Sequence, residues 1–201
     1  MSADPETLAV YEARAADYAR LVEADGPGGA LRAFIAALPK GGRVLDLGCG
    51  AGGASAQMAA AGLVPDPVDA AQAMVDLARA KGLPARRGTF DDLNAEAEYD
   101  GVWASFSLLH APRAAMPGHL SAIHRALKPG GLLHIGVKLG TGEGRDALGR
   151  FYTYYEADEL RGLVQDAGLV VTSERQTLDR GLAGTIAAGI LLLARKEATD
   201  A

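Results

Sequence analysis

One stretch, VLDLGCGAGG at residues 44–53, restricts the possible folds of this chain more than any other. It reads as a buried strand that runs into a glycine loop and then into a helix. Such a turn places backbone N–H groups and the positive end of a helix at the carboxyl edge of a sheet, where a ligand fits. Gly48, Gly50 and Gly53 also satisfy the G-x-G-x-x-G spacing, which permits a dinucleotide-binding turn but is a weak signal by itself.

The rest of the chain alternates short apolar runs with longer stretches of helical spacing, which is typical of a buried parallel sheet in an α/β fold. The predicted strands are 43–47, 64–68, 85–88, 101–106, 132–137, 169–177 and 185–195, and the predicted helices are 5–24, 28–38, 53–61, 71–81, 117–127 and 156–167. The last two strands lie too close together for a helical crossover. We therefore expect five parallel strands followed by an antiparallel hairpin.

Composition indicates one soluble domain over residues 1–201, because 49% of the residues are hydrophobic and 22% are charged. Cys49 is the only cysteine, and an unpaired thiol fits a reducing cytoplasm. The polar N-terminal segment does not have the pattern of a signal peptide. The longest apolar run near the C-terminus, 186–194, is shorter than the ~20 residues of a membrane-spanning helix. We expect a cytoplasmic protein.

The net negative charge of the chain indicates which binding partners are favoured. A net charge of -5 repels nucleic acid and anionic membranes, so we expect neither as a partner and favour a small molecule that is neutral or cationic. The two helices that precede the first strand make residues 1–40 a candidate lid.

Two carboxylates further restrict the class of ligand that the glycine loop can bind. Asp46 alternates with Leu45 and Leu47, so its side chain is expected at the strand end, where it would repel a pyrophosphate and attract the ammonium and sulfonium of S-adenosylmethionine. Its alternative role is to cap the loop. Asp69, at the end of the next strand, can accept both hydroxyl protons of a ribose, or act as a helix N-terminal acid, and the two roles can coexist.

The chain resembles the class I S-adenosylmethionine-dependent methyltransferases at several motifs. The residues that carry the resemblance are VLDLGCGAGG at 44–53, Asp69 with Met74, GTFDDL at 88–93, YDGVWASFSLLH at 99–110 and ALKPGG at 126–131. The segment KLGTGEGRD at 138–146 is similar to one in small, uncharacterised bacterial members whose substrates are not assigned.

The resemblance implies a Rossmann-like three-layer sandwich with a seven-stranded, mostly parallel sheet in the order 3-2-1-4-5-7-6, in which strand 7 is antiparallel. It implies S-adenosyl-L-methionine as the cofactor. The residues expected to bind it are Tyr18, Asp46, Gly48, Cys49, Gly50, Asp69, Ala70, Met74, Thr89, Phe90 and Ser105.

The sequence departs from the family pattern at three places. Pro65 and Pro67 fall inside the second strand, where each removes a hydrogen-bond donor, so we expect a short or bulged strand. Thr89 replaces the acidic residue that members often place after strand 3 for the adenine amino group, which leaves its hydroxyl or Asp91 for that contact. Ala71 replaces a frequent serine, so the following helix is less well capped.

Methyl transfer from a sulfonium is an in-line displacement that needs positioning and, for some acceptors, removal of a proton. His110 is the candidate catalytic residue, as a general base or a substrate-orienting group, and its alternative is a structural histidine. Substrate-binding candidates are Tyr11, His110, Lys138, Arg145, Arg150, Tyr152 and Tyr155, and the basic ones suggest an anionic acceptor. The alternatives are ordinary packing for the tyrosines and ion pairs for the cations. The histidine spacings predict no metal site.

The predicted function is transfer of a methyl group to an O, N or S atom of a small molecule by a monomer or homodimer. Two alternatives are an NAD-dependent oxidoreductase and a non-catalytic S-adenosylmethionine-binding domain. Methylation of nucleic acid or protein is disfavoured by the charge balance and by Ser-Phe-Ser-Leu at 105–108, where base-methylating relatives carry an Asn-Pro-Pro-Tyr type signature.

Overall fold

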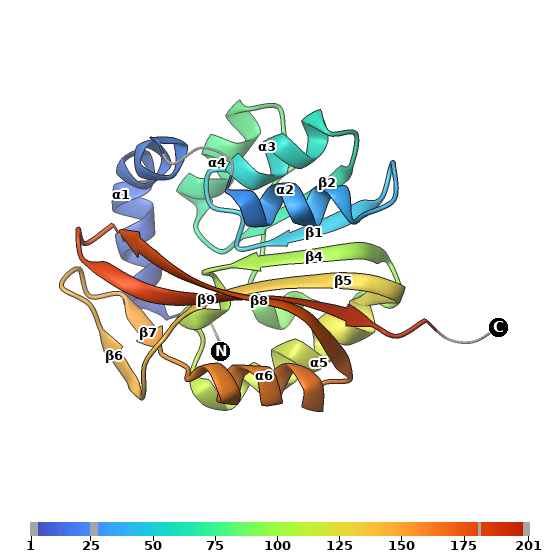
Figure 1. Cartoon of the computed structure of the whole chain (residues 1–201). Coiled ribbons are helices and arrows are strands. Elements are labelled where there is room, and N and C mark those ends of the chain that lie inside the picture. Colours follow the sequence, from blue (N-terminus) through green and yellow to red (C-terminus); the bar gives the residue numbers. More distant parts are fainter. Residues whose placement is uncertain (1–3, 25–27, 181, 199–201) are drawn as a thin grey trace.

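The computed structural model describes residues 4–24, 28–180 and 182–198. A seven-stranded sheet lies between helices on its two faces (Figure 1). The strands are β1 (Arg43–Leu47), β2 (Val64–Asp69), β3 (Arg86–Arg87), β4 (Tyr99–Ser105), β5 (Leu127–Lys138), β6 (Glu143–Arg145), β7 (Phe151–Thr153), β8 (Leu169–Arg180) and β9 (Ile186–Lys196). The helices are α1 (Pro5–Ala24), α2 (Gly29–Ala36), α3 (Gly53–Ala60), α4 (Gln72–Ala80), α5 (Met116–Ala126) and α6 (Ala157–Asp166), with short 3₁₀ turns η1 (Phe90–Asp92), η2 (Leu108–His110) and η3 (Arg113–Ala115).

The strand order confirms the predicted topology. The sheet runs β3-β2-β1-β4-β5-β9-β8, which is 3-2-1-4-5-7-6 when only its own strands are counted. The antiparallel strand is β9, which pairs with β5 on one side and β8 on the other. The structure adds a two-stranded ribbon, β6–β7, that the sequence pattern did not predict. Its strands have three residues each, too few to show a clear alternation.

The expectation of a short or bulged second strand is wrong, because β2 has six residues and pairs with β1 in unbroken parallel register from Val64 to Val68. The reason lies in the spacing of the prolines. The Val64 N–H donates toward the β1 side, to Gly42 O, so alternation turns Pro65 and Pro67 toward β3. There the ladder with β3 involves only Val68 and Asp69, so both missing donors fall where few partners exist.

Two apolar clusters separate the faces of the sheet. Alternate residues of the central strands point to opposite sides, so Leu45 and Val102 join the cluster under α5 and α6, whereas Val44 and Trp103 join the cluster with α2. Figure 1 shows α2, α3 and α4 on one side of the sheet and α5 and α6 on the other. The parallel strands therefore end at one edge, beside α1.

The candidate lid divides into two parts with different positions. Helix α1 lies at the carboxyl edge of the sheet (Figure 1), and its backbone departs from helical geometry at Arg14. Helix α2 instead buries Leu31 and Phe34 against the sheet, with the Phe34 ring 5.1 Å from that of Trp103. Residues 1–3 and 25–27 of the candidate lid lie outside the described residues.

The glycine loop predicts a stability difference between two alanine variants. Gly41 and Gly48 have similar positive φ angles, 71° and 82°. A Cβ at Gly48 would lie 2.3 Å from Ser107 Cβ, whereas one at Gly41 meets nothing within 4 Å. Both variants place an alanine at a positive φ and so carry similar backbone strain, but only Gly48→Ala adds a steric clash. We therefore expect Gly48→Ala to lower the free energy of unfolding by ~1–3 kcal/mol more than Gly41→Ala. Urea denaturation measures both, and equal losses would contradict the close approach.

Candidate functional site

The glycine loop after β1 is fixed from two sides. The N–H groups of Gly48 and Cys49 both donate to Val68 O, at 2.8 and 2.9 Å. On the other side the hydroxyl of Ser107, which follows β4, donates to Leu47 O at 2.6 Å. The loop is thus held between the ends of β2 and β4, and Gly48 approaches Ser107 so closely that no side chain fits.

Asp69 ties this loop to the next helix. Its two carboxylate oxygens accept the N–H groups of Gly50 (2.8 Å) and Ala71 (2.9 Å), one each. Burial raises the pKa of the carboxyl, although these two donors oppose the shift. The bond to Ala71 corresponds to the helix N-terminal role expected from the sequence. Each oxygen keeps a lone pair that can receive another donor.

Asp46 lies deeper than the sequence suggested. Its carboxylate is 2% exposed and accepts the Ser55 hydroxyl at 2.6 Å, from the first turn of α3. Burial raises its pKa to about 7. The expectation that this side chain emerges as a charged group at the strand tip therefore differs from its placement, because Ser55 and the loop cover it.

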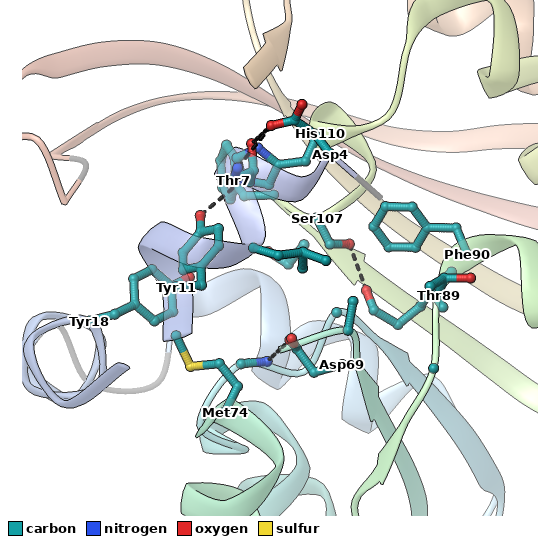
Figure 2. A pocket seen from close by; sticks show the side chains of 18 residues that line it. Asp4, Thr7, Tyr11, Tyr18, Asp69, Met74, Thr89, Phe90, Ser107 and His110 are labelled. Carbon is teal, nitrogen blue, oxygen red and sulfur yellow. Dashed lines mark hydrogen bonds between the residues drawn. The ribbon is translucent and has the colours of Figure 1, made fainter. Parts of the chain in front are cut away.

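A pocket opens in front of the loop (Figure 2), lined by Asp4, Thr7, Leu8, Tyr11, Tyr18, Leu47, Gly48, Gly50, Asp69, Ala70, Met74, Gly88, Thr89, Phe90, Ser105, Phe106, Ser107 and His110. Nine of the eleven residues predicted to bind the cofactor are among them. The two others, Asp46 and Cys49, line a neighbouring cavity behind the loop. Sequence spacing alone could not separate these two sides of the loop.

Helix α1 covers the pocket through polar contacts at three points. Asp4, at the start of α1, receives both Nη groups of Arg145 at 2.8 Å. The Thr7 hydroxyl accepts the Phe151 N–H at 2.8 Å. Glu12 accepts the N–H groups of Gln72 and Ala73 and so caps the start of α4. The cover is therefore attached to both the β6–β7 ribbon and the α4 side of the pocket.

His110 is engaged at both ring nitrogens. Nδ1 lies 2.6 Å from Phe151 O, which can only accept, so Nδ1 carries the hydrogen and Nε2 accepts the Tyr11 hydroxyl at 2.9 Å. Arg150 donates to the same hydroxyl at 3.0 Å. Burial lowers the pKa of His110 to about 4, so the ring is neutral at neutral pH. It can take a proton only after Tyr11 moves away.

The basic residues predicted to bind an anionic methyl acceptor have partners within the protein. Arg145 is bonded to Asp4, and the 2% exposed Arg150 is bonded to Asp146 at 2.7 Å. Lys138 lies over the ring of Tyr152, 3.9 Å from its centroid. These contacts correspond to the ion-pair alternative, because the carboxylates neutralise both guanidinium groups. The geometry therefore does not favour an anionic acceptor at these arginines.

The two tyrosines predicted to bind substrate near the β6–β7 ribbon, Tyr152 and Tyr155, are buried. Tyr152 is 3% exposed and packs against the His110 ring at 4.7 Å between centroids. Tyr155 is fully buried under Arg113 and lines neither the pocket nor the cavity behind the loop. Of the seven substrate-binding candidates, the pocket brings together Tyr11 and His110 only.

Thr89 has a local structural role. Its hydroxyl and its N–H both contact Asp92, which forms a capping box at η1. Neither Asp91 nor Asp92 lines the pocket. Asp91 is therefore not placed for the contact that the sequence assigned to it or to the Thr89 hydroxyl, whereas Thr89 and the flanking Phe90 both line the pocket (Figure 2). The Thr89 hydroxyl donates to Asp92, so its oxygen can still accept a hydrogen bond.

Several pocket residues were missed by the sequence analysis. Thr7 and Tyr11 are four residues apart on α1, a spacing that places them on one face and could have revealed Thr7. Asp4 before Pro5 is a helix-start signal. Ser107 has no comparable signal, because its role depends on the distance between the ends of β1 and β4. Within the described residues no group of three or more His, Cys, Asp or Glu side chains could hold a metal ion.

The geometry agrees with comparisons to known proteins. Residues 44–131 match the model of a methyltransferase domain. An uncharacterized methyltransferase of Synechocystis sp. is 34% identical over 99 residues, which is 48% of this chain and 47% of that protein. A ubiquinone biosynthesis O-methyltransferase of Xanthomonas oryzae pv. oryzae is 37% identical over 103 residues, or 47% of this chain and 42% of that protein. The match thus spans less than half the length of these relatives.

A solved structure covers more of the chain. The 1,6-didemethyltoxoflavin-N1-methyltransferase of Burkholderia thailandensis, solved with bound 1,6-didemethyltoxoflavin and S-adenosylhomocysteine, superposes with a TM-score of 0.71 and 25% identity over 98% of this chain and 92% of that one. Residues 44–131 thus match a methyltransferase domain, and the chain has the Rossmann-like fold of an S-adenosylmethionine-dependent methyltransferase, as the resemblance implied.

The ribose contact that the sequence assigns to Asp69 predicts that its removal lowers the affinity for the cofactor. Asp69→Asn keeps the shape of the side chain but removes its charge and one of its acceptors. We expect the Kd of S-adenosylhomocysteine to rise ~10–100-fold, as calorimetry measures it. Asp66→Asn is the matched control, since Asp66 lies on the same strand but bonds Arg86 and Tyr99 away from the pocket. An equal loss in both variants would contradict the assignment.

Burial of Asp46 predicts a pH-dependent stability. Its folded pKa of about 7 exceeds the ordinary value of 3.8. The stability that this carboxyl contributes is therefore complete at low pH and is lost as the pH rises toward about 7. Relative to Asp46→Asn, the wild-type free energy of unfolding should fall across this interval and then level off. Urea unfolding at several pH values measures it, and parallel profiles would refute the burial argument.

Proposed function

We propose that this protein transfers the methyl group of S-adenosylmethionine to an O, N or S atom of a small-molecule acceptor. The observation that carries the proposal is the joint placement of the glycine loop, the Asp69 carboxylate and the apolar side chains of Met74 and Phe90 around one pocket under α1 (Figure 2). This set offers backbone and carboxylate groups for a ribose and an apolar wall for a base. It provides no cationic cradle for a pyrophosphate.

The residues present fit the cofactor once the cover moves. The free volume of the pocket is about 80 Å³, below the ~300–1,000 Å³ of pockets that hold ligands of this size. Helix α1 contributes Thr7, Leu8 and Tyr11 to the lining of this small pocket. Its withdrawal, with release of the Asp4–Arg145 ion pair, would admit the cofactor, and its return would exclude water from the reacting atoms.

The bound cofactor supplies the electrophile, a methyl group on a positively charged sulfur. The acceptor forms the new bond to carbon, the carbon–sulfur bond breaks, and a proton is lost from an acceptor that carries one on the attacking atom. Tyr11 and His110 would shape the rim of this pocket as an uncharged pair. His110 acts here as a positioning residue, because Tyr11 occupies its accepting nitrogen.

The remaining parts of the proposal follow from composition. A single domain over residues 1–201, in the cytoplasm and as a monomer or homodimer, fits the composition and the lone cysteine. The net charge of -5 favours a small molecule over nucleic acid. No helix in the described part of the chain is long and apolar enough to cross a membrane.

Calorimetry and an activity screen test the proposal. We expect S-adenosylhomocysteine to bind and NAD⁺ not to bind, because the Asp69 carboxylate in this pocket disfavours a pyrophosphate. A screen of thiols, amines and hydroxy compounds should then give release of S-adenosylhomocysteine from S-adenosylmethionine with at least one class. Binding of NAD⁺ alone would overturn the cofactor assignment. Cofactor binding without release in any class would support the non-catalytic alternative.

A further inference from the structure

A second, larger cavity lies behind the glycine loop. Its volume is about 780 Å³, within the range of small-molecule sites. Its floor comes from β1, β4, β5 and β9, and its sides come from α2 and α3. Along β9 the side chains alternate: Ile190 and Leu192 enter the core under α6, whereas Leu191 faces this cavity. The cavity thus lies on the sheet face opposite α5 and α6.

One wall carries a polar group without a partner. His134 of β5 lines the cavity, is 3% exposed, and has no hydrogen-bond partner for Nε2 within the described part of the chain. Its ring stacks on Trp103 at 3.7 Å between centroids, which fixes the ring. Burial lowers its pKa to about 3, so the imidazole is neutral and offers one donor and one acceptor. Buried polar groups are normally paired, so this ring nitrogen indicates a ligand or a water.

The other walls are mostly apolar. Trp103 and Phe106 contribute aromatic surface, and Ala30, Leu31 and Leu191 contribute aliphatic surface. Asp46, which is bonded to Ser55, and the uncharged side chains of Gln57, Ser105 and Thr177 add polar groups to this lining. A mostly apolar lining whose polar groups are uncharged or paired favours an uncharged ring compound. Arg175 and Lys81 also line the cavity, but both are exposed at its rim.

The cavity meets the cofactor pocket at the loop. Tyr18, Gly48, Gly50, Ser105 and Phe106 line both spaces. A compound in the cavity can therefore present one end to the boundary while its other end reaches His134. The rim of the cofactor pocket has fewer free hydrogen-bonding groups for a methyl acceptor, because both nitrogens of His110 already have partners.

We propose that this cavity is the acceptor chamber of the enzyme, that it takes an uncharged aromatic compound with a hydroxyl or ring N–H group, and that His134 positions that group by a hydrogen bond. The inference rests on the proposed methyl transfer. In this arrangement the end of the compound that receives the methyl group lies near Ser105 and Gly48. His134 is a positioning residue and takes no part in bond making.

A pair of probes tests the chamber without knowledge of the natural acceptor. 2-Naphthol and naphthalene differ only by a hydroxyl group. Trp103 is the only tryptophan of the chain, so quenching of its emission reports binding beside it. We expect the wild-type protein, saturated with S-adenosylhomocysteine, to bind 2-naphthol at least ~10-fold more tightly than naphthalene, as one hydrogen bond allows.

His134→Phe keeps an aromatic ring beside Trp103 and removes both ring nitrogens. We expect it to abolish the preference for 2-naphthol and to leave the affinity for naphthalene unchanged, a pattern that simple loss of folding cannot give. His119→Phe is the matched control, since His119 is also buried with an unpartnered Nε2 in the described structure but does not line the cavity. It should keep the wild-type preference.

The outcomes separate the two proposals. If S-adenosylhomocysteine binds but wild-type protein shows no preference for 2-naphthol, or His134→Phe retains it, the chamber is refuted and the methyltransferase proposal stands. Competition between 2-naphthol and S-adenosylhomocysteine would assign the cavity to the cofactor and overturn the chamber. Tighter binding of 2-naphthoate than of 2-naphthol would overturn the uncharged acceptor. Failure of S-adenosylhomocysteine to bind would overturn the proposed function and the acceptor chamber with it.

Discussion

The site depends on how the glycine loop is held between two neighbouring strands. Val68 O receives two N–H groups of the loop from one side, and Ser107 donates to Leu47 O from the other. Asp69 then joins the loop to the start of α4. These bonds fix the backbone groups at the carboxyl edge of the sheet before any ligand arrives, so little ordering remains for the binding step.

The loop also divides the space around it. In front lies the narrow pocket under α1, with Asp69, Met74 and Phe90. Behind it lies the larger cavity with Trp103 and His134. The two carboxylates that look equivalent in the sequence fall on different sides: Asp69 faces the front pocket, whereas Asp46 is buried with Ser55 and borders the rear cavity. The same loop can therefore serve two binding spaces that meet at Gly48.

Helix α1 links the pocket to the β6–β7 ribbon. Its contacts to the ribbon side are polar, through Asp4, Thr7 and Tyr11, and their partners Arg145, Phe151 and Arg150 lie on or beside the ribbon. The partly exposed Asp4–Arg145 ion pair contributes little to stability, whereas Ala15 packs in an apolar cluster with Ala71 and Met74 and holds the other side of the helix. Both arginines predicted to bind the acceptor thus contact the cover instead: Arg145 pairs with Asp4, and Arg150, which pairs with Asp146, donates to the Tyr11 hydroxyl.

The sequence by itself determined the strands of the central sheet, the helices, their order along the chain and the antiparallel hairpin, because these depend on local periodicity, glycine positions and short connections. It also located the glycine loop and Asp69 of the front pocket, since residues at the carboxyl ends of parallel strands converge, and the resemblance to a known family supplied most of the other residues predicted there. Only the tertiary structure decided how deep Asp46 lies, what pairs with Arg145 and Arg150, and that His134 faces a cavity. Those outcomes depend on distances between segments far apart in the chain, which no local pattern encodes.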